Sequence, residues 1–172
     1  MPDTSTVDIS LVKQLVFDAG RDELLPRFQP TSFSYKQDGS IVTEADISVQ
    51  KRLQLALYDH FPTIPLLGEE MAEHEQTAII AHEKSRFWCL DPLDGTSNFA
   101  SGIPFFSISL ALIENGQPKL AIIYDPARHE CFTANKGQGA FLNETQLDST
   151  NSTHKALRRC TAIIDFKGCP PN

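Results

Sequence analysis

The sequence contains little cysteine, and the cysteines it has are widely spaced. Only four of its 172 residues are cysteine, and no two of them form the Cys-x-x-Cys pair of a structural zinc site. In a chain of this size without a signal peptide we expect reduced thiols. Cys89 lies in an alternating apolar run, so we expect its side chain to pack rather than to react. The cysteines are Cys89, Cys131, Cys160 and Cys169.

Long apolar runs and an excess of positive charge are also missing. No run approaches the ~20 apolar residues that span a bilayer. The N-terminus has neither the basic start nor the apolar core of a signal peptide. The formal net charge is −7, which argues against a broad basic surface for nucleic acid. We therefore expect a cytoplasmic protein that binds neither a membrane nor a nucleic acid.

The size and composition are those of an ordinary soluble globular protein. Of the 172 residues, 41% are hydrophobic and 22% are charged. This length is enough for one domain with a real core, or for part of a larger protein.

Apolar residues at helical spacing predict two N-terminal helices. The first runs from Ile9 to Ala19, with Asp8 or Ser10 as its cap, and prolines follow it. The second follows Thr43, which has Asp46 at the spacing of a capping box. Taken alone, Asp46 is explained as a first-turn charge that complements the helix dipole.

Short β-type runs dominate the rest of the chain. A strand over residues 64–67 is expected to precede a polar surface helix over residues 73–83. Three later runs separated by turn sequences predict an antiparallel meander. These runs cover residues 105–113, 119–124 and 130–134. A last apolar run, 161–166, predicts a strand that either closes the sheet or opens a second domain.

The most informative segment is the run from Trp88 to Phe99. A strand-like lead-in ends in Asp91 and Asp94, and a Gly-Thr turn follows. Paired carboxylates beside free N–H groups can hold Mg²⁺ and a phosphate together, because Mg²⁺ shares oxygen ligands with substrate phosphates. The same pattern also fits a tight turn with Asx-type hydrogen bonds. Two further acidic positions at element boundaries, Asp46 and the Gly-Glu-Glu triplet at 68–70, favour the metal site.

Three ordered motifs resemble the Mg²⁺-dependent, lithium-sensitive phosphomonoesterases of the inositol monophosphatase superfamily. They are K-x-D-G-S-x-V-T-x-A-D at 36–46, G-E-E at 68–70 and W-x-x-D-P-L-D-G-T-x-N-F at 88–99. The resemblance runs from about residue 10 to residue 147. It implies an α+β fold in which two N-terminal helices pack on an antiparallel sheet, as the first domain of a layered αβαβα enzyme. It also implies a homodimer.

The resemblance implies a set of metal ligands. Glu69 and Asp91, with the main-chain carbonyl of Leu93, would hold one Mg²⁺, and Asp91 and Asp94 would hold a second. The complete family uses two or three ions per site, and Mn²⁺ is an alternative. Glu70 would support these ligands without binding the metal itself.

The resemblance also implies groups that act on the water and the substrate. Asp46 and Thr96 would orient and deprotonate the attacking water, and the N–H groups of Gly95 and Thr96 would bind phosphate oxygens. The expected substrate-contacting residues are Glu69, Leu93, Asp94, Gly95 and Thr96. Lys36 is interpreted as a surface lysine.

The chemistry agrees with these roles. Phosphate-monoester hydrolysis is among the slowest uncatalysed reactions, and two metals can neutralise the phosphate and activate water. Hard cations require carboxylates, and no histidine lies in the motifs, so all five histidines are expected at the surface.

A phospho-aspartate phosphatase is excluded, because its nucleophilic Asp lies two residues before its second Asp. Here that position is Pro92.

One family motif is absent from the sequence. The C-terminal Trp-Asp motif supplies another ligand to the second metal, but the only tryptophan here is Trp88. We therefore predict an N-terminal metal-binding phosphatase domain over residues 1–155 and the first strand of an incomplete C-terminal domain over residues 156–172. Exposed apolar surface, and hence self-association, should follow.

Three interpretations and several substrates stay open. The chain is the N-terminal portion of an active phosphatase, a catalytically silent metal- or partner-binding module, or a soluble remnant without function. We favour the first, with inefficient turnover by this chain alone. The open substrate classes are inositol phosphates, 3′-phosphoadenosine 5′-phosphate, histidinol phosphate and sugar phosphates.

Overall fold

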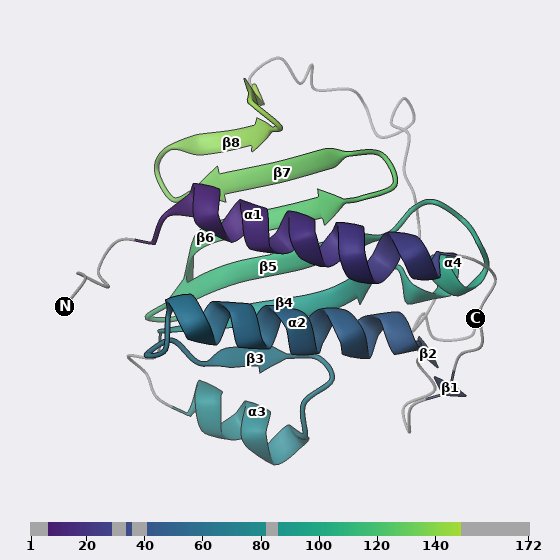
Figure 1. Cartoon of the computed structure of the whole chain (residues 1–172). Helices are drawn as coiled ribbons and strands as arrows, with labels where there is room; N and C mark the ends of the chain where they lie inside the picture. Colours follow the sequence, from purple (N-terminus) through teal and green to yellow (C-terminus); the bar gives the residue numbers. More distant parts are fainter. Residues whose placement is uncertain (1–6, 29–33, 36–40, 82–85, 149–172) are drawn as a thin grey trace, which may run out of the picture.

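The structure, a computed structural model, describes residues 7–28, 34–35, 41–81 and 86–148. In this part of the chain two long helices, α1 and α2, lie side by side across one face of a seven-stranded sheet (Figure 1). The predicted α+β class is confirmed.

None of the helices that the structure describes has the length and hydropathy of a membrane span. Several predictions fall outside these residues: Lys36, His82, His154, Cys160, Cys169, the strand at 161–166 and the segment 156–172.

The two predicted N-terminal helices are present at the expected positions. Helix α1 spans Ile9–Ala19, and its cap is Asp8, whose Oδ1 accepts a hydrogen bond from the Ser10 N–H at 2.8 Å. The chain continues through a π-helical turn, η1 (Gly20–Leu24), into a short 3-10 turn, η2 (Leu25–Arg27). Helix α2 spans Glu44–His60 and begins at the Thr43 capping box that the sequence predicted.

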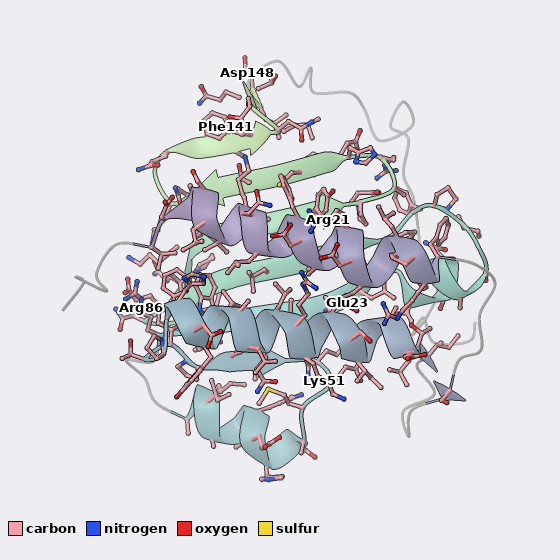
Figure 2. The ribbon with its side chains drawn as sticks, viewed as in Figure 1. Arg21, Glu23, Lys51, Arg86, Phe141 and Asp148 are labelled. Atoms are coloured by element: carbon pink, nitrogen blue, oxygen red, sulfur yellow. The ribbon has the colours of Figure 1, made fainter. Side chains whose placement is uncertain are left out.

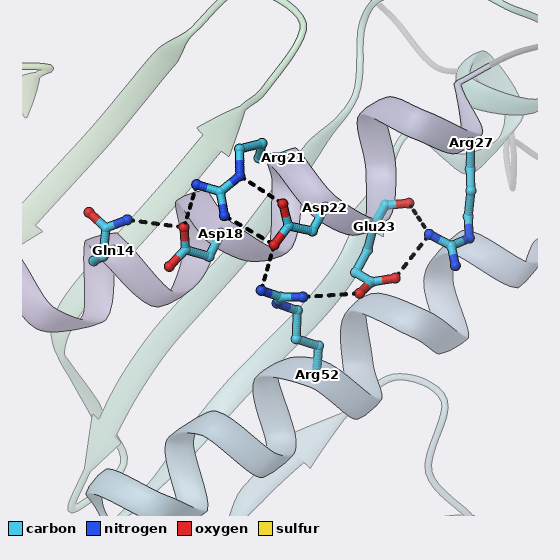
Figure 3. A network of polar contacts seen from close by, with 7 residues as sticks. All are labelled: Gln14, Asp18, Arg21, Asp22, Glu23, Arg27 and Arg52. Carbon is cyan, nitrogen blue, oxygen red and sulfur yellow. Dashed lines mark hydrogen bonds and ion pairs between the residues drawn. The ribbon is translucent and has the colours of Figure 1, made fainter.

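An ion-pair network fastens the first helical segment to α2 (Figure 3). Arg52 of α2 donates to Asp22 Oδ2 at 2.7 Å and to Glu23 Oε1 at 3.2 Å, and both acceptors lie in η1. Glu23 also pairs with Arg27 at 2.9 Å. The network therefore helps to set the position of α2, whose first turn carries Asp46.

The large sheet is mixed rather than purely antiparallel. Its strand order is β3-β4-β5-β6-β7-β8-β9, and all neighbours are antiparallel except β3 and β4. The parallel pair arises because helix α3 (Glu73–Ile80) connects β3 to β4 by a crossover. The strands are β3 Leu66–Gly68, β4 Arg86–Asp94, β5 Ser107–Glu114, β6 Gln117–Asp125, β7 Glu130–Asn135, β8 Gly139–Leu142 and β9 Thr145–Gln146. Separately, β1 (Ser34–Tyr35) pairs with β2 (Ile41–Val42).

The core lies between the helices and one face of the sheet. Trp88 and Leu90 of β4 are buried there, and Phe61 at the end of α2 packs on Trp88 with ring centroids 5.5 Å apart. Side chains alternate along a strand, so Cys89 points to the opposite face and is exposed. The prediction that the Cys89 side chain packs is therefore wrong, because Trp88 and Leu90 take the buried face of β4.

Among the described residues, both long helices lie on one face of the sheet, and the opposite face is left open and apolar (Figure 1). One row across it begins at Cys89 and continues through one alanine on each of β5, β6, β7 and β8. A neighbouring row contains Ile123 and Phe132, which are 43% and 37% exposed. Figure 2, viewed from the helix side, shows the side chains of the described residues on this scaffold.

Candidate active site

A bulge in β4 brings the two aspartates of the main motif to one side of the strand. Asp91 pairs with Ser109 and Asp94 pairs with Ser107, so three steps along β4 match two steps along β5. In a regular strand, residues three apart point to opposite faces, and one extra residue restores the same face. Pro92 lies within the bulge, where a missing N–H is tolerated. The spacing Asp-x-x-Asp therefore fits a bulged strand.

Gly95 converts the end of β4 into a helix start. Its φ is +88°, and a Cβ there would lie 2.9 Å from the Phe105 carbonyl oxygen, so only glycine fits without strain. Helix α4 (Thr96–Ala100) begins at the next residue. The turn thus places Thr96 directly after the β4 bulge that carries Asp91 and Asp94.

Asp46 and Thr96, 50 residues apart in the sequence, meet at this point. The Asp46 side chain is only 2% exposed, and its Oδ2 accepts from the Thr43 N–H at 2.8 Å and the Thr43 hydroxyl at 2.5 Å. Its Oδ1 lies 3.1 Å from the Thr96 hydroxyl, which is also 2.8 Å from the Leu93 carbonyl oxygen. One carboxylate oxygen caps α2, and the other faces the motif, so both interpretations of Asp46 are compatible.

The electrostatics of the site are those of crowded carboxyl groups. Burial, followed by the negative charges of Glu69 and Asp94, raises the pKa of Asp91 to about 7. The Leu93 N–H donates to Asp91 Oδ1 at 3.1 Å and opposes this shift. Burial also raises the pKa of Asp46, against the hydrogen bonds from Thr43 and Thr96.

The donor set fits a hard divalent cation. All the groups are carboxylate, carbonyl and hydroxyl oxygens, which Mg²⁺ prefers. An acid whose pKa is raised by neighbouring carboxylates gains stability when a cation neutralises them. Within the described ranges, no three acidic, imidazole or thiol side chains already surround one metal position. The negative charges of Glu69 and Asp94 both act on Asp91.

The structure thus gathers the predicted residues into two adjoining groups. Asp46, Thr96 and the Leu93 carbonyl form one, and Glu69, Asp91 and Asp94 form the other. The predicted surface position of the histidines is confirmed for the three that the structure describes, which are exposed. They are His60, His74 and His129.

Two polar residues at the site were not predicted from the sequence. Gln50 of α2 and Gln76 of α3 bond to the loop that carries Glu69. Helix α3 was expected to carry little chemistry, and nothing in its local pattern marks Gln76. Gln50 carried one signal, because it is a polar residue between the apolar residues Val49 and Leu53 in α2.

The sequence matches known proteins along most of its length. A sequence model described as the inositol monophosphatase family matches residues 7–165. An inositol-1-monophosphatase of Rhizobium meliloti (strain 1021) is 36% identical over 141 residues, which cover 81% of this chain and 51% of that protein. A protein named Nus factor SuhB, of Xylella fastidiosa, is 39% identical over 109 residues, 63% of this chain and 37% of the relative. The chain spans about half the length, or less, of these curated relatives.

Solved structures show the same fold. The Thermotoga maritima IMPase superposes with a TM-score of 0.71 at 31% identity, over 81% of this chain and 52% of that one. An IMPase/NADP phosphatase complexed with Mg²⁺ and phosphate gives 0.64 at 30% identity, over 80% and 49%. A staphylococcal inositol monophosphatase soaked in LiCl, described as an inhibitory complex, gives 0.65 at 26% identity, over 81% and 50%.

Proposed function

The chain belongs to the inositol monophosphatase family, and from this membership we propose that it carries the metal- and water-binding part of a Mg²⁺-dependent phosphomonoesterase. The observation that carries the proposal is the contact between Asp46 Oδ1 and the Thr96 hydroxyl at 3.1 Å. It joins two motifs that are far apart in the sequence, directly beside a carboxylate pair. The Asp46–Thr96 pair can take a proton from a water molecule next to a metal site.

Four groups of the site would hold the cations. Glu69, Asp91 and the Leu93 carbonyl form one ligand set, and Asp91 and Asp94 form a second. When bound, Mg²⁺ would neutralise phosphate charge and lower the pKa of a coordinated water. Mn²⁺ is an alternative, and two or three ions per site are proposed for the complete protein.

Thr96 and Asp46 would relay the proton of the attacking water. The Thr43 hydrogen bonds hold Asp46 Oδ2, so only Oδ1 is directed at Thr96. The Thr96 hydroxyl gives its proton to Asp46 and takes one from the water. Because burial raises the pKa of Asp46, its carboxylate is a stronger base than an exposed one.

The turn after β4 would bind the substrate phosphate. The backbone N–H groups of Gly95 and Thr96 lie at the start of α4, where unpaired donors favour an anion. Glu69, Leu93 and Asp94 would contact the substrate from the metal side. The substrate is proposed to be a small phosphate monoester, with inositol phosphates, 3′-phosphoadenosine 5′-phosphate, histidinol phosphate and sugar phosphates as the classes to test. We further propose a cytoplasmic homodimer.

The test is phosphate release by this chain with Mg²⁺ over those four substrate classes. We expect slow release on at least one substrate, at least tenfold lower in Asp91→Asn and inhibited by Li⁺. Asp59→Asn, an exposed aspartate at the end of α2, is the matched control and should leave the rate unchanged. Release that is equal in Asp91→Asn and the parent would contradict the proposed site.

A second candidate is a catalytically silent module that binds a metal or a protein partner. The observation that favours it is that several relatives carry the name Nus factor SuhB rather than that of a phosphatase. Mn²⁺ binding by calorimetry, without phosphate release on any substrate, would support it. Release that depends on Asp91 would exclude it.

A further inference from the structure

The loop between β3 and α3, residues 68–71, carries Glu69 and is here called the Glu69 loop. Two backbone hydrogen bonds define its course. The Glu69 N–H donates to the Leu90 carbonyl at 3.2 Å, and the Met71 N–H donates to the Gly68 carbonyl at 3.3 Å. Other backbone groups of the loop bond to the side-chain amides of two glutamines, one from each flanking helix.

Gln50 holds the loop from α2 as a hydrogen-bond acceptor. Its side chain is 8% exposed, and its Oε1 accepts from the Glu70 N–H at 2.9 Å. A Cβ on Gly68 would lie 2.4 Å from the same oxygen, so the absence of a side chain there lets the amide approach. Because an N–H can only donate, this contact fixes which end of the Gln50 amide faces the loop.

Gln76 holds the same loop from α3 as a donor. Its Nε2 lies 3.2 Å from the Gly68 carbonyl oxygen, 3.3 Å from that of Glu69 and 3.1 Å from that of Met71. The two hydrogens of the amide are shared among three acceptors. The two glutamines therefore satisfy opposite kinds of backbone group in one short loop.

We infer that Gln50 and Gln76 are positioning residues, which hold the Glu69 loop in the conformation that presents Glu69 to a cation. The inference rests on the proposed function in one respect, the role of Glu69 as a ligand. Residues that orient a ligand without touching the metal commonly change metal affinity 10- to 100-fold when mutated.

Helix α2 connects the two groups of the site through this contact. Asp46 and Gln50 are four residues apart, so they lie on the same face of the helix. Asp46 reaches Thr96, and Gln50 reaches the backbone of Glu70. One rigid helix face thus sets the position of the Glu69 loop relative to the Asp46–Thr96 pair.

The test exchanges each amide for groups of similar length. Gln→Met removes both polar ends. Gln→Glu keeps an acceptor oxygen whether the acid is charged or neutral, and in its charged form it has no donor. Gln54→Glu adds the same charge at an exposed position one turn along α2 and is the matched control. Far-UV circular dichroism and thermal unfolding establish that each variant is folded.

The first readout is Mn²⁺ uptake, followed by the loss of the electron paramagnetic resonance signal of free Mn²⁺. We expect Gln50→Glu and Gln54→Glu to bind within about threefold of the parent chain. Gln50→Met, Gln76→Met and Gln76→Glu should bind about 10- to 100-fold more weakly. Equal affinity in Gln50→Met and the parent, or equal losses in Gln50→Glu and Gln50→Met, would overturn the inference.

The second readout is independent of metal. Hydrogen exchange at the Glu70 amide should be about tenfold faster in Gln50→Met and unchanged in Gln50→Glu. If the parent chain takes up no Mn²⁺, the proposed metal site is wrong, and Glu70 exchange then decides the loop-holding role alone. Unchanged exchange in Gln50→Met would reject that role even if Mn²⁺ binds.

Discussion

At the scale of single residues, Asp91 shows how a functional group can oppose folding. Its carboxyl group is partly buried, and this burial together with the charges of Glu69 and Asp94 raises its pKa to about 7. A folded-state pKa above the unfolded value near 4 means that the folded chain binds the proton more tightly. The protonated Asp91 therefore stabilises the folded chain relative to the unfolded chain. This stabilisation is complete below about pH 4 and is lost as the pH rises through about 7.

We predict that Asp91→Asn stabilises the metal-free chain at pH 8 but not at pH 4. Each unit of pKa shift corresponds to about 1.4 kcal/mol, and solvent screening at this partly exposed group reduces the total to roughly 1–2 kcal/mol. Thermal unfolding in EDTA measures the difference, and Asp59→Asn is the control. Lower stability of Asp91→Asn at pH 8 would contradict the assigned environment of Asp91.

At the scale of elements, ion pairs connect the π-helical segment η1 to helix α2. Arg52 bridges Asp22 and Glu23, which are successive residues of η1 (Figure 3). These side chains are partly exposed, so the network contributes a modest and salt-dependent amount. Its main consequence is geometric, because α2 carries both Asp46 and Gln50.

We predict that Arg52→Met lowers the melting temperature by roughly 1–3 °C at low salt. Lys51→Met is the matched control, because Lys51 is the neighbouring residue, exposed and labelled in Figure 2. The difference between the two variants should shrink in about 1 M salt, where charges are screened within about 3 Å. A difference that persists in high salt would assign the effect of Arg52 to packing.

At the scale of the whole molecule, the described residues bury one face of the sheet and leave the other open. The open face holds the exposed Ile123 and Phe132 beside a row of small side chains. Apolar surface of this kind promotes association. The predicted boundary between residues 155 and 156 stays a prediction, and the family match continues across it to residue 165.

We predict that the chain self-associates and binds the dye ANS through this face. The double variant Ile123→Lys/Phe132→Lys should shift the protein toward monomer in analytical ultracentrifugation and reduce ANS fluorescence. Ile80→Lys, which charges an exposed apolar residue on α3, should change neither measurement. A monodisperse parent chain that does not bind ANS would contradict the prediction.

Local sequence determined helix α1, the start of α2 and the residue types of the site. Helical spacing predicted α1, and the Thr43–Asp46 pair predicted the start of α2, because both signals act within a few residues. The clustered carboxylates predicted a hard-cation site, since ligand chemistry depends on residue type. Their roles as ligands stay a prediction that the experiments above address.

Only the tertiary structure decided how these parts face one another. The β4 bulge places Asp91 and Asp94 on one side, and the crossover through α3 makes β3 parallel to β4. The neighbours of Cys89 in β4 occupy the buried face, so its thiol is exposed. Gln50 accepts a hydrogen bond from the N–H of Glu70, which is 20 residues away in the sequence. Register and partner choice depend on contacts between segments far apart in the chain, which a local pattern does not contain.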